Sequence, residues 1–421
     1  MFNAVKRELD LARKLMAFSI LRLIAQVVGI GLPLLIAKFF SEQIFGSFSL
    51  TKMIVFLAVT FTTGITRTPF IVYASEEIEE SGKINKTFSI QLIFLFCGII
   101  TATIAFLVFH TPIAKFAGIT TTDLIFAFVA FLGIAGKFFF CNLLMAMGKQ
   151  IRNGIAELTY ACSSVIIIIL FHIFDNLTLR TVFLSYFLST VLLFLTQGWI
   201  LDIRLLLPFQ IDLSLLKKTI DFAKWIFLAA IATYLINWGD NIVLKIFVSL
   251  KEIGIYNFGY QVFKSLVFSI GIIPQYFLPF IAANISNSAK IRNYLYSKRP
   301  KILALGCLVW LIAFFGIPFA IKLVYGSKFS ESIPIFQILS IAILFSLYLT
   351  FYAPVYNALK KYRFTTFVAI AQITFNLLFA FILVPYYGIK GAAIATVIAF
   401  GVKLIVFEFH YRRYLKKRFS K

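Results

Sequence analysis

The sequence predicts an all-α, polytopic membrane protein with twelve transmembrane helices, arranged in two six-helix lobes around a central cationic cavity. Apolar residues make up 61% of the 421 residues and charged residues only 14%, which is far outside the soluble-globular range. The charges stand in short clusters between apolar stretches, as membrane topology requires. The net charge of +23 therefore reflects that topology, and we exclude a nucleic-acid-binding protein on this ground.

The apolar stretches are each of about spanning length, close to 20 residues. We expect spanning helices near residues 15–37, 46–66, 87–109, 123–147, 154–174, 179–201, 219–248, 255–283, 301–324, 333–358, 364–384 and 389–411. The polar connections are too short to hold a soluble domain. We therefore expect two lobes, residues 1–210 with helices one to six and residues 211–421 with helices seven to twelve.

The ends of the predicted helices differ strongly in positive charge. With the N-terminus in the cytoplasm, the inside segments hold 26 Lys and Arg residues and the outside segments hold 8. Cytoplasmic segments carry the excess of Lys and Arg in membrane proteins. The asymmetry predicts that both termini are cytoplasmic. Residues 1–14 are polar and basic, and we read the first apolar stretch as a retained helix rather than a signal peptide.

Six cations fall inside the predicted helices: Arg22, Lys52, Lys137, Lys224, Lys264 and Lys403. Lys224 lies near a cytoplasmic end and can extend its ammonium group to the interface. The other five are deeper, and on insertion scales they cost on the order of 12–18 kcal/mol together. Such a cost indicates that they have a use.

Helical spacing predicts which way the polar side chains point. Four helices carry a polar stripe with a period of about 3.6 residues. These are Ser19, Arg22, Gln26 and Gly29 in the first helix, Ser49, Lys52, Thr60 and Thr63 in the second, Thr233, Asn237 and Asp240 in the seventh, and Asn257, Gln261, Lys264, Gly271 and Gln275 in the eighth. Polar stripes in lipid face the bundle interior or water, so these helices would enclose a wet cationic cavity.

The two halves resemble each other at an offset near 210 residues. Phe45-Gly46-Ser47-Phe48 after the first helix parallels Ile253-Gly254-Ile255-Tyr256 after the seventh, and Lys52 and Lys264 follow in the next helix. Six helices per half is an even number, so the repeat axis should lie along the membrane normal.

No residue pattern predicts an enzyme, a cofactor or a metal site. The four cysteines lie inside apolar stretches without paired spacing, and the three histidines form no cluster. The sequence contains no nucleophile–base arrangement, phosphate-binding glycine loop or ATP motif. We therefore predict a protein that is not an enzyme and does not use ATP directly.

Three stretches in the second half carry a resemblance to a known family. They are Asp240-Asn241-Ile242-Val243-Leu244 leading to Glu252-Ile253-Gly254-Ile255-Tyr256, then Val324-Tyr325-Gly326-Ser327-Lys328-Phe329 followed by Ser332 and Pro334, and finally Asn376 with the run from Val384 to Thr396. In this order they resemble the bacterial Wzx-type polysaccharide-repeat-unit (O-antigen) flippases, within the multidrug/oligosaccharidyl-lipid/polysaccharide exporter superfamily. The twelve-helix plan extends the resemblance to the whole chain.

The resemblance implies a substrate, a mechanism and a location. The substrate would be an oligosaccharide on a polyprenyl diphosphate carrier, moved by alternating access across the bacterial cytoplasmic membrane for lipopolysaccharide or another surface polysaccharide. Membrane lipid and the polysaccharide polymerase machinery would be partners. Two alternatives stay open: a multidrug/cation antiporter of the same superfamily, and a membrane polysaccharide polymerase or ligase, which the short outside connections disfavour.

We expect the substrate to bind Arg22, Lys52 and Lys264 first, then Lys137, Lys403, Gln26, Asn257 and Gln261. The alternative for the cations is an intramembrane ion pair that holds helices together, for instance with Asp240. Lys403 has Glu408 just over one turn away as such a partner. Asp240 is a candidate for coupling transport to an ion, with a structural role as the favoured alternative. Glu157 would stabilise the start of the fifth helix.

Overall fold

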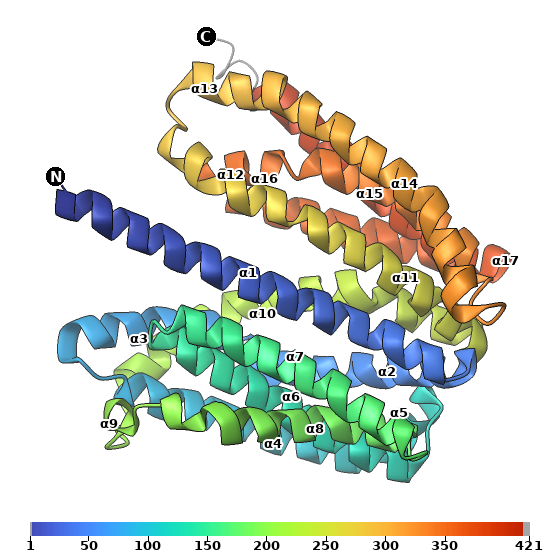
Figure 1. The fold of residues 1–421 in the computed structure, drawn as a ribbon, viewed down its shortest axis with the longest axis horizontal. Coiled ribbons are helices and arrows are strands. Elements are labelled where there is room, and N and C mark those ends of the chain that lie inside the picture. The colour runs from blue at the N-terminus through green and yellow to red at the C-terminus, as the bar shows by residue number, and fades with distance from the viewer. Residues whose placement is uncertain (1, 416–421) are drawn as a thin grey trace. The chain divides into compact units, whose positions relative to one another are not determined.

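The structure, a computed structural model, describes residues 2–415 and contains helices but no strand in that range (Figure 1). The predicted all-α class is therefore confirmed. Ten helices among the described residues are long and apolar enough to cross a membrane. The chain is thus a multi-pass membrane protein by composition and helix length.

The predicted number of twelve spans is not confirmed, and stays a prediction. The expected spans 364–384 and 389–411 both lie in α17 (Tyr362–His410), which Gly388 interrupts with a φ of 55° and a ψ of −137°. Glycine tolerates a positive φ, so the chain can break there between two helical stretches. The expected span 255–283 corresponds to α11 (Leu250–Ile270) and α12 (Ile272–Ala283), which are not among the ten.

The chain forms two compact units. Unit 1 comprises Met1–Leu35 and Ser47–Ile231, and unit 2 comprises Ile36–Gly46 and Ala232–Lys421. Three helices pass from one unit to the other: α1 (Phe2–Phe39), α2 (Glu42–Val59) and α10 (Leu213–Phe247). The predicted lobes, residues 1–210 and 211–421, stay a prediction, since the units have other bounds.

Unit 1 is a helical bundle in which α6 packs against α7 and α8. Its further helices are η1 (Thr60–Gly64), α3 (Arg67–Ser81), α4 (Asn85–Val108), α5 (His110–Ala117), α6 (Thr121–Ala146), α7 (Gln150–Ile173), α8 (Leu179–Gln197), η2 (Gly198–Ile200) and α9 (Ile203–Leu206). A Cβ on Gly133 of α6 would lie 2.6 Å from the Cα of Phe187 on α8. The Thr190 hydroxyl donates to the Gly133 carbonyl oxygen over 2.7 Å, so a small residue lets these backbones approach.

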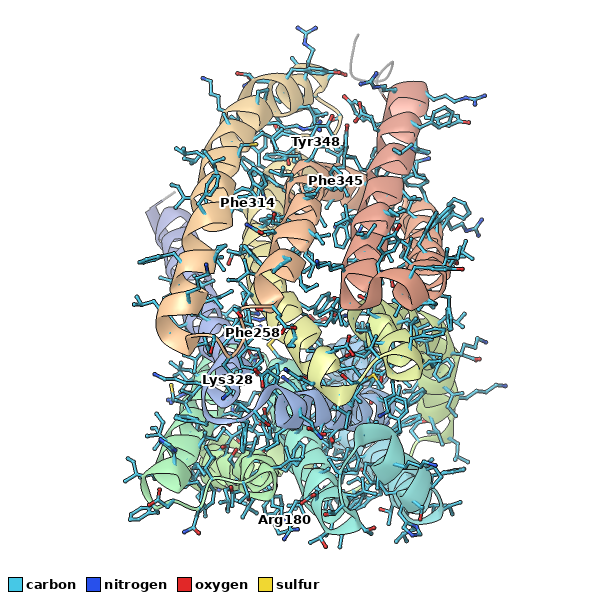
Figure 2. The ribbon with its side chains drawn as sticks, turned by 90° about the vertical axis from the view of Figure 1, so that its right-hand side faces the viewer. Arg180, Phe258, Phe314, Lys328, Phe345 and Tyr348 are labelled. Carbon is cyan, nitrogen blue, oxygen red and sulfur yellow. The ribbon has the colours of Figure 1, made fainter. Side chains whose placement is uncertain are left out.

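Carboxylates fix two helix ends in unit 1. Glu77 of α3 accepts hydrogen bonds from the backbone N–H groups of Lys86 and Thr87, over 2.9 and 2.8 Å, and so caps α4. Asp123 closes the capping box of α6 and also accepts from Arg180 Nε at 2.7 Å. Arg180 lies at the surface of this unit in Figure 2.

Unit 2 contains α11 and α12, followed by α13 (Ser288–Asn293), η3 (Tyr294–Lys298), α14 (Arg299–Tyr325), α15 (Ser332–Leu349), α16 (Tyr352–Ala358), α17 and η4 (Tyr411–Leu415). Helix α15 packs against α11 and α17. The core of the unit is rich in aromatic side chains. Tyr256, Tyr294, Tyr352 and Tyr356 are almost fully buried in it.

The connection between α14 and α15 anchors one end of unit 2. Phe329 is fully buried and stacks on Phe258 of α11 with ring centroids 4.3 Å apart. Phe45 lies edge-on to both rings, at 5.8 and 6.5 Å. Lys328 Nζ donates to the Lys38 carbonyl oxygen over 3.2 Å, at the same end of the unit as Phe258 in Figure 2. These contacts give the Val324–Phe329 motif a structural role.

Candidate functional site

The intramembrane cations divide between the two units. Arg22, Gln26, Lys52 and Lys137 lie in unit 1, and Lys264, Lys403, Asn257 and Gln261 lie in unit 2. The central cavity shared by two lobes stays a prediction.

In unit 1, Arg22 of α1 lies beside Glu157 of α7. The distance from Arg22 Nε to Glu157 Oε2 is 3.9 Å, and the two side chains are 39% and 16% exposed. Arg22 Nε makes no hydrogen bond to the described residues, so this is a long ion pair without a donor–acceptor contact. Glu157 is the eighth residue of α7, too far along to stabilise the helix start. The alternative of an intramembrane ion pair, for which Asp240 was one example, therefore has Glu157 as the carboxylate beside Arg22.

Lys137 of α6 faces α7, the helix that carries Glu157. Its Nζ lies 5.5 Å from the ring centroid of Tyr160 and 4.4 Å from that of Phe138. Tyr160 is three residues after Glu157, so Arg22 and Lys137 approach one face of α7 within a turn of each other. Gln26 follows Arg22 by one turn of α1 and is half-buried.

Lys52 of α2 is half-buried between two aromatic rings. Its Nζ lies 5.7 Å from the centroids of both Phe48 and Phe56, which are the residues one turn before and after it. Cation–π contacts of this kind lower the cost of an ammonium group in an apolar environment. Lys52 follows Gly46 by six residues and Lys264 follows Gly254 by ten, so the two differ by about one helical turn.

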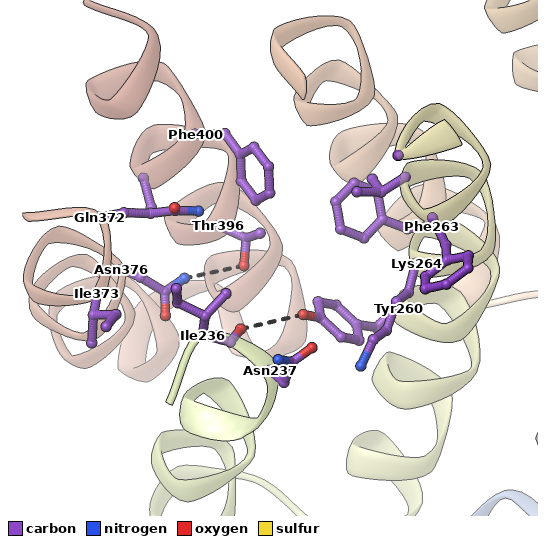
Figure 3. Close-up of a pocket in the computed structure, with 14 residues that line it drawn as sticks. Ile236, Asn237, Tyr260, Phe263, Lys264, Gln372, Ile373, Asn376, Thr396 and Phe400 are labelled. Carbon is purple, nitrogen blue, oxygen red and sulfur yellow. Dashed lines mark hydrogen bonds between the residues drawn. The ribbon is translucent and has the colours of Figure 1, made fainter. Parts of the chain in front are cut away.

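In unit 2, Lys264 of α11 lines a cavity of about 300 Å³. Figure 3 shows it opposite Gln372, Asn376 and Thr396 of α17, with Asn237 of α10 below. Lys264 Nζ lies 5.7 Å from the ring of Trp238. In the described part of the chain no carboxylate lies within 4.0 Å of this ammonium group. The cavity wall therefore offers a cation, amides and the hydroxyls of Tyr260 and Thr396.

Asp240 stands directly behind that wall. Its Oδ2 accepts from the Tyr256 hydroxyl at 2.5 Å and from the Thr396 hydroxyl at 2.9 Å, and Asn376 Nδ2 donates to Thr396 over 3.2 Å. Asp240 is only 6% exposed, and its Oδ1 has no hydrogen-bond partner among the described residues. The described ion pairs contain no Asp240–Lys264 pair. Asp240 thus joins α10 to α11 and α17 while keeping one free oxygen.

The other candidates in unit 2 lie outside this cavity. Asn257 is buried and donates to Asn241 Oδ1 over 2.6 Å, so its amide joins α10 and α11. Gln261 is half-buried on α11 and is absent from the lining. Lys403 lies with its Nζ 5.9 Å from the Phe400 ring. The alternative role for Lys403, an ion pair with Glu408, is not found among the ion pairs of the described residues, in which Glu408 accepts from Arg412 Nε at 2.6 Å.

Sequence reasoning missed the polar residues of α17 that complete the cavity. Gln372, Asn376 and Thr396 lie one to several turns apart around the break at Gly388, so they form no continuous stripe. Asn376 and Thr396 do stand within the stretch that carries the family resemblance. That resemblance was therefore the available signal for these positions.

Comparisons with known proteins agree with this architecture. The family described as "Polysaccharide biosynthesis protein" matches residues 75–334. An uncharacterized membrane protein of Methanocaldococcus jannaschii, MJ1068, is 21% identical over 370 residues, covering 80% of this chain and 71% of that protein. The capsular polysaccharide biosynthesis protein CapF of Staphylococcus aureus is 28% identical over 144 residues, 34% of this chain and 36% of CapF.

Solved structures share the fold across nearly the whole chain. The lipid II flippase MurJ in its inward closed conformation has a TM-score of 0.76 at 17% identity, covering 96% of this chain and 89% of MurJ. An inward-facing multidrug resistance MATE transporter of the MOP superfamily has a TM-score of 0.77 at 15% identity, covering 95% of each chain. This chain therefore has the MurJ- and MATE-like transporter fold, and it belongs to the polysaccharide biosynthesis protein family.

Proposed function

We propose that this protein is a flippase that moves polyprenyl-diphosphate-linked oligosaccharides across the bacterial cytoplasmic membrane by alternating access, for O-antigen or a related surface polysaccharide. One observation carries the proposal. Lys264 lines a cavity whose other polar side chains are the amides of Asn237, Gln372 and Asn376 and the hydroxyls of Tyr260 and Thr396. A cation suits the diphosphate, and neutral hydrogen-bonding groups suit sugar hydroxyls.

The diphosphate is the feature common to carrier-linked glycans of any sugar sequence. It is anionic and cannot cross hydrocarbon alone. Arg22, Lys52 and Lys264, supported by Lys137 and Lys403, would compensate its charge during passage, with Gln26, Asn257 and Gln261 as polar contacts. Arg22 can hold phosphate oxygens with two parallel donors, whereas a Lys acts as a point charge. An inside-negative potential of about 100 mV adds roughly 2.3 kcal/mol per negative charge moved outward.

The Arg22–Glu157 pair suggests how the protein keeps its cation when no substrate is bound. Two charges in an apolar environment cost less as a pair than singly. At 3.9 Å the pair holds no hydrogen bond that the substrate would have to break. We propose that the diphosphate takes the place of Glu157 beside Arg22 when the substrate enters.

Asp240 is the proposed point of coupling to an ion. Its Oδ2 is held by two hydroxyl donors while its Oδ1 has no partner in the described part of the chain. A buried carboxylate in this state gains from binding a proton or a small cation. The network from Asp240 through Thr396 to Asn376 would connect that event to the cavity wall.

A multidrug/cation antiporter is the second candidate, because the MATE transporter shares the fold with a TM-score of 0.77. A cavity that binds organic cations would be expected to present carboxylates to its ligand. The described Lys264 cavity presents a Lys, and none of its lining residues is acidic. This lining favours an anionic substrate over a cationic drug.

The test is transport into proteoliposomes that contain the purified protein and a fluorescent polyprenyl-diphosphate oligosaccharide. We expect flipping to be lost in Arg22→Ala and in Lys264→Ala, and Arg22→Lys to retain part of the rate. Lys322→Ala is the matched control, because Lys322 is an exposed cation in the last turn of α14. Wild-type rates in both alanine variants would exclude the cationic mechanism. Efflux of an organic cation without glycan transport would establish the antiporter instead.

A further inference from the structure

A second polar cavity of about 260 Å³ lies at the end of unit 2 that carries η4, and it shares no lining residue with the Lys264 cavity. Its lining comes from η3, α14, α15, α16, α17 and η4. The residues are Leu295, Tyr296, Arg299, Tyr348, Tyr352, Glu408, Tyr411 and Arg412. Figure 2 shows Tyr348 near the opposite end of this unit from Lys328.

Arg299 is the residue that marks this cavity as a binding site. Its side chain is only 7% exposed, and the guanidinium carbon lies 3.7 Å from the ring centroid of Tyr348 and 4.7 Å from that of Tyr352. Its Nε and Nη2 are buried and have no hydrogen-bond partner among the described residues. Buried charged donors without an acceptor are costly, so the site is incomplete as it stands.

The nearby carboxylate does not complete it. Glu408 accepts from the hydroxyls of Tyr348 and Tyr352 and from Arg412 Nε. None of the ion pairs in the described part of the chain includes Arg299. The lining therefore holds two guanidinium groups and one carboxylate, which leaves the cavity with a net positive charge. The hydroxyls of Tyr296 and Tyr411, 3.4 Å apart, are further donors in the lining.

We propose that this cavity binds the phosphate group of an anionic phospholipid, with Nε and Nη2 of Arg299 as two parallel donors to its oxygens. That edge of a guanidinium matches the oxygen spacing of a phosphate. The site lies where the apolar helix α14 begins and the apolar helix α17 ends, and helix termini are where headgroups meet a membrane protein. Lys298 and Lys301 are exposed beside Arg299 and add positive charge.

The experiment measures the apparent Tm of the purified protein in detergent with added phosphatidylglycerol, phosphatidylcholine or inorganic phosphate. We expect phosphatidylglycerol to raise the Tm above the level that phosphatidylcholine gives, since choline adds a cation that a positive cavity disfavours. Arg299→Gln should remove this increment and weaken binding of phosphatidylglycerol by about tenfold or more. Inorganic phosphate alone could raise the Tm instead, with Arg299→Gln removing that rise. The cavity would then be a phosphate site whose ligand is free phosphate, and the phospholipid would be excluded.

Arg413→Gln is the matched control. Arg413 is an exposed arginine of η4 that contacts Phe409 and Tyr414 and does not line the cavity, so its variant should keep the full increment. An undiminished increment in Arg299→Gln would overturn the proposal. If that variant fails to fold, native mass spectrometry of the wild type decides, because equal retention of both phospholipids would also overturn it. Neither measurement depends on glycan transport.

Discussion

Gly46 of α2 and Gly254 of α11 face each other inside unit 2, and each is the fifth residue of its helix. A Cβ on Gly46 would collide with the carbonyl oxygen of Leu250, and a Cβ on Gly254 would collide with that of Glu42. Glu42 is four residues before Gly46, and Leu250 is four residues before Gly254. Each helix therefore presents the same glycine and carbonyl to the other. The repeated glycine of the two sequence halves thus allows two helix backbones to touch.

This contact predicts a large effect of a single methyl group. Gly46→Ala and Gly254→Ala should each force the helices apart and destabilise the protein by about 1–3 kcal/mol. The measurement is the apparent Tm in detergent. Gly316→Ala on α14 is the control, because nothing lies within 4 Å of a Cβ there and alanine favours the helix. Equal Tm values for all three variants would contradict the close contact.

The ion pair between Arg22 and Glu157 predicts that substitutions can restore the stability of the protein without restoring transport. Glu157→Gln should lower the apparent Tm, because it leaves the Arg22 charge without its partner. Adding Arg22→Ala to this variant should restore the Tm, since no charge is then left unpaired. The double variant should still fail to transport glycan. Recovery of transport together with the Tm would show that Arg22 has only a structural role.

The free oxygen of Asp240 predicts a change in ion dependence. Asp240→Asn keeps an oxygen that can accept from Tyr256 and Thr396, so the variant should accumulate in the membrane. It should lose the dependence of transport on a proton or sodium gradient, measured in proteoliposomes with each gradient imposed separately. Asn241→Ala is the comparison, because it alters the neighbouring α10–α11 contact without touching the carboxylate. An unchanged gradient dependence in Asp240→Asn would leave Asp240 a structural residue.

The cap that Glu77 places on α4 predicts a local loss of stability. Glu77→Ala removes the acceptor of two backbone N–H groups and should destabilise the protein by about 0.5–2 kcal/mol. The apparent Tm in detergent reports the change. Glu80→Ala, an exposed glutamate of the same helix, should leave it unaltered. An equal decrease in Tm in both variants would show that the loss of charge, and not the loss of the cap, lowers the stability.

The charge asymmetry predicts the orientation of the chain. Cysteines placed singly at Ser41, Thr111 and Ser330 of a cysteine-free variant should react with an impermeant reagent added outside. Cysteines at Ser81, Ser288 and Ser420, the last of which lies outside the described residues, should react only after the membrane is opened. The reverse pattern would place both termini outside and remove the directional argument for an anionic substrate.

The sequence by itself determined the class of the protein. Apolar stretches and charge clusters follow from the membrane as solvent, which acts on each segment separately, and so they are readable without a fold. The stretch from Asn376 to Thr396 carried the family resemblance because local motifs survive in sequence. The polar stripes of four helices were also readable, since a stripe depends only on a period of 3.6 residues.

Only the tertiary structure decided what each face meets. Helical periodicity places Arg22 and Lys264 on polar faces, but it does not say that Glu157 lies opposite the first. It offered Lys403 as one local partner for Glu408, but it gave no sign of the two tyrosines from other helices, Tyr348 and Tyr352, that donate to this carboxylate. Arg299 counted only as one of the cations of the inside segments, and no sequence pattern indicated a binding site there. Contacts between helices far apart in the chain depend on packing, and single-helix patterns do not encode that choice.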